Sequence, residues 1–139
     1  MRVQDLFSLK GKTALVTGGG RGIGKFIATG LAEAGANLVI ASRKMKNLEA
    51  AAGEIRQCCG AEVLPVACDV AKEEDIDALV KAALEKFGRI DILVNNAGII
   101  RRNRSIDFTE KDWDEVMDIN LKTLFFLSQA VARQFLKQG

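Results

Sequence analysis

The sequence of 139 residues contains no histidine and no tyrosine, and these two absences restrict the chemistry it can perform. Histidine is the side chain that enzymes use most often for proton transfer, and tyrosine is another donor. Mechanisms that depend on either one are therefore excluded for this chain alone. Because histidine is also a common zinc ligand, its absence argues against a zinc centre, and we expect no metal site.

Cysteine is scarce as well. Cys58, Cys59 and Cys68 form no Cys-x-x-Cys pair, which argues against a zinc or redox motif. The adjacent pair stands near the end of an expected helix, where reduced and partly buried side chains are the favoured interpretation. Reduced thiols indicate a reducing compartment, so we expect a cytoplasmic protein.

Long apolar runs and an excess of one charge are also missing. No run approaches the ~20 residues of a membrane span, and residues 1–5 lack the apolar core of a secretion signal. The formal net charge of +2 points to neither nucleic acid nor a membrane as the main partner. The length suits one domain over residues 1–139, and apolar residues form 48% of the chain, enough for a core.

Strand-like and helix-like segments alternate four times along the chain. We expect apolar strands at Thr13–Thr17, Asn37–Ala41, Val63–Ala67 and Ile92–Asn95, and helices at Gly22–Ala34, Lys46–Cys59, Glu73–Phe87 and Glu110–Lys137. Apolar runs without alternation are typical of parallel strands covered on both faces. The pattern predicts an α/β fold, a Rossmann-type doubly wound parallel sheet truncated after four strand–helix units.

Glycine and proline mark the boundaries of these elements. Gly35, Gly60 and Gly88 each follow an expected helix, where a left-handed cap residue is favoured. The single proline, Pro65, falls within the third strand, which predicts an edge position, and the strand order 3-2-1-4 provides one. Thr109, three residues before Asp112, resembles a capping box at the start of the fourth helix.

The most informative segment is TGGGRGIG, between the first strand and the first helix. Glycines permit a tight turn and let the backbone approach a diphosphate, and the first helical turn offers unpaired N–H groups to phosphates. An ordinary glycine-rich turn is the alternative. We predict that a dinucleotide is bound here by Thr17, Gly18, Gly20, Arg21, Gly22, Ile23 and Gly24. The helix that follows is expected to bury one apolar face, formed by Ile23, Phe26, Ile27, Leu31 and Ala34.

The end of the second strand bears on the choice of cofactor. A fold that prefers NAD usually places an acid about 20 residues past the glycine turn. Here that position holds Ser42, followed by Arg43. A hydroxyl and a guanidinium suit a 2′-phosphate, and Arg21 can supply a second cation. We therefore predict NADP rather than NAD, with a solvated basic loop as the alternative interpretation.

Further polar and small residues follow the third and fourth strands. Asp69 can accept a hydrogen bond from an adenine amino group or can cap the next helix, and both roles stay open. Asn95-Asn96-Ala97-Gly98 provides small residues that let the backbone lie against a ligand, and amides that tie neighbouring loops together. The arginines at positions 101, 102 and 104 can bind a carboxylate or merely solvate their loop.

These motifs, in this order, resemble the short-chain dehydrogenase/reductase family. The segment from residue 95 to 139 is similar to its sugar-acid branch, which includes gluconate 5-dehydrogenases and 2-deoxy-D-gluconate 3-dehydrogenases. The resemblance implies an NADP-dependent oxidoreductase that acts on a sugar acid or a related polyol or ketone. A 3-ketoacyl reductase-like member is an alternative, in which the arginines have no special meaning.

The resemblance also implies roles for individual residues. Asp69 and Val70 would contact the adenine. Asn120 would hold a water molecule in a proton relay, with a local backbone partner for its amide as the alternative. The stretch beside the adenosine ribose would be Asn95, Asn96, Ala97 and Gly98, and the sugar-acid carboxylate would be bound by Arg101 and Arg102.

The family places a serine on a fifth strand and a Tyr-x-x-x-Lys pair on a fifth helix, and neither has a counterpart in this sequence. Ser128 does not have the spacing to replace the serine. We therefore expect a truncated reductase. The alternative is a catalytically inert fragment that binds cofactor or dimerises.

The fourth helix is apolar on more than one face, so it needs two partners. One is the sheet, and the resemblance implies that the other is the same helix of a second subunit, which predicts a homo-oligomer. Without a fifth strand, the fourth strand would be an open edge. The apolar residues of the helix are Trp113, Met117, Leu121, Leu124, Phe125, Phe126, Leu127 and Val131.

Overall fold

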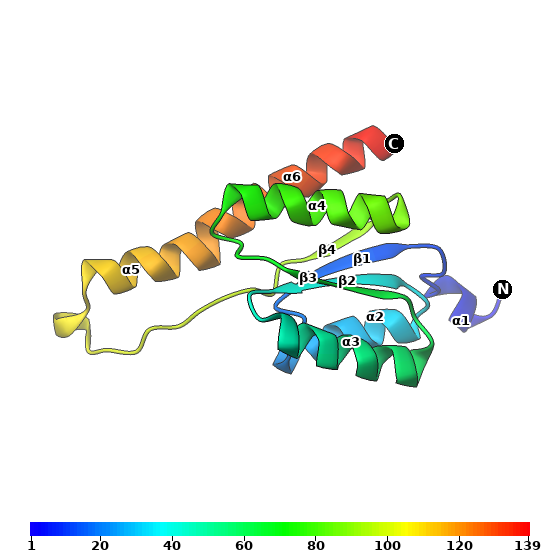
Figure 1. Ribbon diagram of the computed structural model, residues 1–139, viewed down its shortest axis with the longest axis horizontal. Coiled ribbons are helices and arrows are strands. Elements are labelled where there is room, and N and C mark those ends of the chain that lie inside the picture. Colours follow the sequence, from blue (N-terminus) through cyan, green and yellow to red (C-terminus); the bar gives the residue numbers. More distant parts are fainter.

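Four parallel strands form the centre of the molecule in the order β3-β2-β1-β4, and helices cover both faces of this sheet (Figure 1). The computed structural model describes residues 1–139. The strands are β1 (Thr13–Thr17), β2 (Asn37–Ser42), β3 (Val63–Ala67) and β4 (Ile92–Val94). The doubly wound α/β sheet and its strand order are therefore confirmed, and Pro65 does lie on an edge strand.

Two pairs of helices enclose the sheet. On one face lie α2 (Gly22–Glu33) and α3 (Met45–Cys59), and on the other lie α4 (Glu73–Phe87) and α6 (Thr123–Gln138) (Figure 1). The remaining elements are α1 (Val3–Leu6), a 3₁₀ turn η1 (Ser105–Asp107), α5 (Glu110–Met117) and a π-helical turn η2 (Asp118–Lys122). None of the helices combines the length and the apolar character needed to cross a membrane.

Each helical layer encloses its own apolar core. Ala14 and Val16 of β1 point to the core under α2 and α3, and Leu15 points to the core under α4 and α6. All five residues of β1 are buried, as the near-continuous apolar run predicts for a strand covered on both faces. The central strand thereby fixes the position of the glycine turn that follows it.

Most of the predicted boundaries are confirmed. Gly35, Gly60 and Gly88 have positive φ angles of 100°, 66° and 76°, and each follows a helix. The Thr109 hydroxyl accepts a hydrogen bond from the Asp112 N–H at 3.1 Å, so Thr109 caps α5. The return bond of a capping box, from the Thr109 N–H to the Asp112 carboxylate, is not formed.

The predicted apolar face of α2 is wrong for Ile23 and Phe26, although Ile27, Leu31 and Ala34 are half-buried and Leu31 packs against the core. Ile23 and Phe26 are 73% and 78% exposed, whereas the buried residues of this helix are Gly24, Ala28 and Ala32. Small residues face the sheet because the start of α2 packs directly on the backbone of the glycine turn, which leaves no room for long side chains. The expected partial burial of Cys58 is also wrong, since this side chain is exposed.

The expected helix at 110–137 is interrupted. A π-helical turn at Asp118–Lys122 separates α5 from α6. Of the predicted apolar stripe, Leu127 and Val131 are buried, whereas Trp113 is 59% exposed. Only the second half of this helical segment lies on the sheet, because α5 extends beyond it (Figure 1).

Candidate functional site

The glycine turn has the geometry that a diphosphate site requires. Gly18 adopts a positive φ of 66°, and its N–H donates to the Ala41 carbonyl at 2.7 Å. A β-carbon at Gly24 would collide with the Gly18 carbonyl oxygen, so glycine is required there for the helix to pack on the turn. Gly22 also has a positive φ, of 55°, and a β-carbon there would meet no atom within 4 Å. The turn is therefore tightly packed where Gly24 meets Gly18 and has free space at Gly22, and this free space suits a bound phosphate.

Thr17 connects this turn to the end of β4. Its buried hydroxyl accepts hydrogen bonds from the Asn96 N–H at 3.1 Å and the Ala97 N–H at 2.9 Å. The same hydroxyl donates to the Val94 carbonyl at 3.3 Å. The Asn96 side chain donates to the Gly18 carbonyl at 3.3 Å, so its predicted role in tying neighbouring loops together is confirmed. The glycine turn and the 95–98 stretch, both singled out in the sequence, are thus joined by hydrogen bonds.

Basic side chains lie beside the glycine turn. Ser42 ends β2 and is half-buried, while Arg21 and Arg43 are exposed. Neither guanidinium forms an ion pair, in contrast to Arg89 and Arg101 elsewhere in the chain. Gly20 packs against Asn47 and Leu48 near the start of α3. Because α3 directly follows β2, the glycine turn lies beside the end of β2. Two unpaired cations here are available to an anion.

Asp69 organises the turn after β3. One carboxylate oxygen accepts from the Ala71 N–H at 3.1 Å, and the Asp69 N–H donates to the Asp75 carboxylate at 2.8 Å. The helix cap itself is Lys72, so Asp69 stabilises the preceding turn rather than the first turn of α4. Of the two roles left open by the sequence, helix capping is therefore not the one observed.

Several of the predicted residues meet at the carboxyl ends of the strands, where ligands bind in open α/β sheets. One small cavity is lined by Thr17, Val70, Asn95 and Ala97 together with side chains of η2 and α6. Asn95 also donates to the hydroxyl of Ser128 in α6 at 3.0 Å. Four separate segments of the chain, those that follow β1, β3 and β4 and the segment of η2 and α6, are thereby joined at one edge of the sheet.

Asn120 lies in the π-helical turn and holds the loop that follows Gly98. Its Oδ1 accepts from the Ile99 N–H and its Nδ2 donates to the Ile99 carbonyl, both at 2.9 Å. A β-carbon at Gly98 would lie 3.2 Å from that Oδ1, so the glycine allows the close approach. The alternative of a local backbone partner is wrong, because Ile99 is 21 residues away in the sequence.

The three arginines of the following loop have different environments. Arg101 binds the Glu115 carboxylate of α5 through Nε at 3.0 Å and Nη2 at 2.8 Å. Arg104 pairs with Asp107 within the loop. Arg102 is exposed and forms no ion pair. Sequence reasoning missed Glu115, because nothing in a separation of 14 residues indicates that this acid lies opposite Arg101.

Two of the three cysteines, Cys59 and Cys68, are not positioned as nucleophiles. Burial, with smaller contributions from the charges of Asp75 and Asp69, raises the pKa of the Cys68 thiol to about 11. A hydrogen bond with Cys58, with burial second, raises the pKa of Cys59 to about 11. Both thiols are therefore protonated at neutral pH, and the thiolate is the reactive form.

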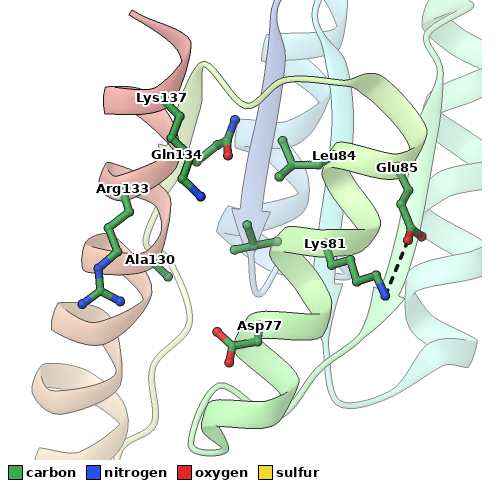
Figure 2. A pocket seen from close by; sticks show the side chains of 9 residues that line it. Asp77, Lys81, Leu84, Glu85, Ala130, Arg133, Gln134 and Lys137 are labelled. Atoms are coloured by element: carbon green, nitrogen blue, oxygen red, sulfur yellow. Dashed lines mark ion pairs between the residues drawn. The ribbon is translucent and has the colours of Figure 1, made fainter.

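A groove larger than the small cavity at the strand ends lies elsewhere on the molecule. This groove of about 560 Å³ runs between α4 and α6, where Lys81 and Glu85 form an ion pair at 3.8 Å (Figure 2). Its rim also carries Asp77, Arg133 and Lys137. None of its lining residues belongs to the site predicted from the sequence, and it lacks a glycine turn. The carboxyl ends of the strands remain the candidate site.

Comparisons with known proteins agree with this geometry. The sequence profile of the family described as short chain dehydrogenase matches residues 12–139. The 2-dehydro-3-deoxy-D-gluconate 5-dehydrogenase of Dickeya dadantii is 45% identical over 142 residues, which cover 99% of this chain and 53% of that protein. The gluconate 5-dehydrogenase of Gluconobacter oxydans is 45% identical, covering 97% of this chain and 52% of that protein.

A solved structure extends the comparison to three dimensions. The short-chain type dehydrogenase/reductase from Mycobacterium marinum matches with a TM-score of 0.95 and 38% identity, covering 99% of this chain and 56% of that one. The chain therefore spans about half the length of the relatives that it matches.

Proposed function

The chain belongs to the short-chain dehydrogenase family, and on this premise we propose that it forms the cofactor-binding part of an NADP-dependent oxidoreductase that acts on a sugar acid. The observation that carries the proposal is the glycine turn, which is tightly packed at Gly24 and has free space beside Gly22. Asp69, Val70 and the stretch 95–98 lie at the same edge of the sheet and would contact the adenosine. No metal takes part in this proposal.

The preference for NADP rests on charge. NADP differs from NAD by a phosphate on the 2′-oxygen of the adenosine ribose, which requires positive charge close by. Arg21 and Arg43 carry that charge, are exposed and form no ion pair, and Ser42 offers a hydroxyl instead of a repelling carboxylate. A guanidinium can bind a phosphate through two parallel hydrogen bonds.

The proposed substrate is a sugar acid, as the names of the two related dehydrogenases suggest. When bound, the nicotinamide would transfer a hydride to or from the substrate. In this chain, Arg102 has a free guanidinium for the substrate carboxylate, and Arg101 is held in place by Glu115 beside it. Asn120 fixes the loop that carries both arginines, and we propose that it also holds a water molecule in the proton relay.

We further propose a cytoplasmic homo-oligomer that pairs through the exposed apolar face of α6. Phe125 and Phe126 lie on that helix, are 59% and 48% exposed, and pack edge to face with their ring centres 5.3 Å apart. A rigid aromatic pair of this kind suits a two-fold contact.

The second candidate is a cofactor-binding fragment without catalysis of its own. The observation that favours it is the lack of tyrosine, since the family resemblance assigns the general acid/base to that residue. An assay of the purified chain with NADPH and 5-keto-D-gluconate separates the two candidates. Oxidation of NADPH faster than in a control without protein contradicts the proposal of an inert fragment. Binding of NADPH without turnover contradicts catalysis by this chain alone.

A further inference from the structure

Two adjacent cysteines, Cys58 and Cys59, end α3 on the side of the molecule opposite the candidate site. Because α3 leads into β3, its last residues lie near the amino ends of the strands, whereas the candidate site lies at the carboxyl ends. Cys58 is exposed, and Cys59 is half-buried and packs against the core under α2 and α3. One thiol is therefore accessible, and the core holds the other in place beside it.

The two thiol groups contact each other. Successive side chains of a helix point about 100° apart, so adjacency in the sequence does not by itself bring two sulfurs together. Here a hydrogen bond joins the side chains of Cys58 and Cys59. The Cys58 thiol donates its only hydrogen to the Ile55 carbonyl at 3.5 Å, so its sulfur is the acceptor for the Cys59 thiol. A β-carbon at Gly60 would meet no atom within 4 Å, so there is free space beside the pair.

The pair is poorly suited to form a disulfide. Consecutive Cα atoms lie about 3.8 Å apart, whereas the Cα atoms of disulfide-linked cysteines usually lie about 4.4–6.8 Å apart. A bond between these two sulfurs would therefore strain the last turn of α3, where the Gly60 N–H donates to the Arg56 carbonyl at 2.9 Å. Both cysteines are free. We expect them to persist as a dithiol that can bind one atom through both sulfurs.

The charges around the pair restrict what that atom can be. The carboxyl end of α3 carries the negative end of the helix dipole. The hydrogen bond with Cys58, burial, and the charges of Cys58 and Glu33 raise the pKa of Cys59, so the Glu33 carboxylate also lies nearby. A monovalent soft cation held by two thiolates would form a complex with net negative charge, which these surroundings disfavour. No group of three or more metal-ligating side chains is present to hold a divalent ion. A neutral adduct of both sulfurs is the product that fits.

We propose that Cys58 and Cys59 form a binding site for a trivalent arsenical that carries one organic group. In the binding step, both thiols condense with one arsenic–oxygen double bond. Two sulfur–arsenic bonds form, the arsenic–oxygen bond breaks, and both thiol hydrogens leave with the oxygen as one water molecule. Arsenic stays trivalent, so the step needs neither an oxidant nor a reductant. Trivalent arsenic binds two sulfurs at close to a right angle, which suits sulfurs that already contact each other.

Phenylarsine oxide and the full 139-residue chain test this site. Native mass spectrometry should show one phenylarsenic group per chain, with the loss of one water molecule. Excess ethanedithiol should remove this group, whereas 2-mercaptoethanol at the same thiol concentration should not. Cys58→Ser and Cys59→Ser should each lower the affinity about 100-fold or more, because binding through two linked groups is lost. The matched control Cys68→Ser changes the same residue type in the core on the other face of the sheet, and should leave the affinity unchanged.

Three outcomes overturn the proposal. They are the absence of an adduct when circular dichroism shows the chain folded, an adduct whose affinity Cys58→Ser leaves unchanged, and an equal loss of affinity in Cys58→Ser and Cys68→Ser. Cys58 is exposed, so its variant keeps the test decisive even where Cys59→Ser fails to fold. No step of the test uses a dinucleotide or a sugar acid, so its result is independent of the proposed function.

Discussion

Asn120 binds Ile99 through both backbone groups of that residue, accepting from its N–H and donating to its carbonyl at 2.9 Å each. This pair joins the π-helical turn to the loop that carries Arg101 and Arg102. The amide geometry of asparagine satisfies both bonds at once, which neither a carboxylate nor an aliphatic side chain can do. Asn120 therefore fixes one end of the candidate substrate loop, and the pair of Arg101 with Glu115 adds a second contact to α5.

The first prediction concerns this contact. Asn120→Ala removes two hydrogen bonds of ~0.5–1.5 kcal/mol each, so the Ile99 amide should exchange with deuterium about 10-fold faster or more. Asn120→Asp keeps the acceptor for the Ile99 N–H and should show a smaller increase. Hydrogen exchange followed by mass spectrometry checks both variants. Unchanged exchange at Ile99 in the alanine variant would show that the contact does not hold the loop.

A second prediction compares the two threonines at the ends of β1. The Thr13 hydroxyl is buried and has no hydrogen-bond partner, whereas the Thr17 hydroxyl makes three hydrogen bonds. Burying an unpaired hydroxyl is unfavourable, so Thr13→Val should raise the free energy of unfolding by ~1 kcal/mol. Thr17→Val should lower it by ~1–3 kcal/mol, because two backbone N–H groups lose their acceptor.

Urea unfolding measures both changes. The same chemical replacement on the same strand should therefore act in opposite directions. A loss of stability in both variants would mean that the Thr13 hydroxyl has a partner in solution.

The third prediction concerns pH. Burial alone would raise the pKa of Asp91, but hydrogen bonds from Arg89 and the Thr13 N–H, with the charges of Arg89 and Lys12, lower it below its ordinary value of 3.8. A lowered pKa in the folded state means that the contribution to stability is complete above the unfolded value of 3.8. It is lost as the pH falls through the folded value.

Unfolding measured from pH 7 down to pH 2 tests this dependence. Asp91→Asn should be less stable at pH 7 by ~1.5–3 kcal/mol, the range for hydrogen bonds to a charged group. Its stability should also fall less between pH 4 and pH 2, because it lacks the ionisation. Parallel curves for the two proteins would exclude Asp91 as the cause.

The sequence predicts the sheet well because its signals are local. Apolar runs, the Pro65 edge strand and the glycines after the helices each depend on a few neighbouring residues, and the structure confirms them. The buried face of α2 was not predictable in this way. Its orientation is set by how closely Gly24 approaches Gly18, a tertiary contact that overrides the preference for burying Ile23 and Phe26.

The candidate site was predictable in its parts but not in its connections. Glycine and asparagine residues at the ends of strands indicate which segments form the candidate site. The hydroxyl of Thr17 as the link between two loops, and the Glu115 carboxylate beside Arg101, arise from long-range packing that leaves no periodic signal. The apolar pattern of residues 110–137 likewise gives no sign of the π-helical turn around Asn120.

The most direct test of the account is a pair of calorimetric titrations of the purified chain with NADP⁺ and NAD⁺. Charge-assisted hydrogen bonds from Arg21 and Arg43 to the 2′-phosphate should favour NADP⁺ about 10-fold or more, which corresponds to ~1.4 kcal/mol. Arg43→Ala should reduce this preference, whereas Arg133→Ala, an exposed arginine of the remote α4–α6 groove, should leave it unchanged. Equal affinity of the unmodified chain for the two dinucleotides, or binding of neither, would contradict the account.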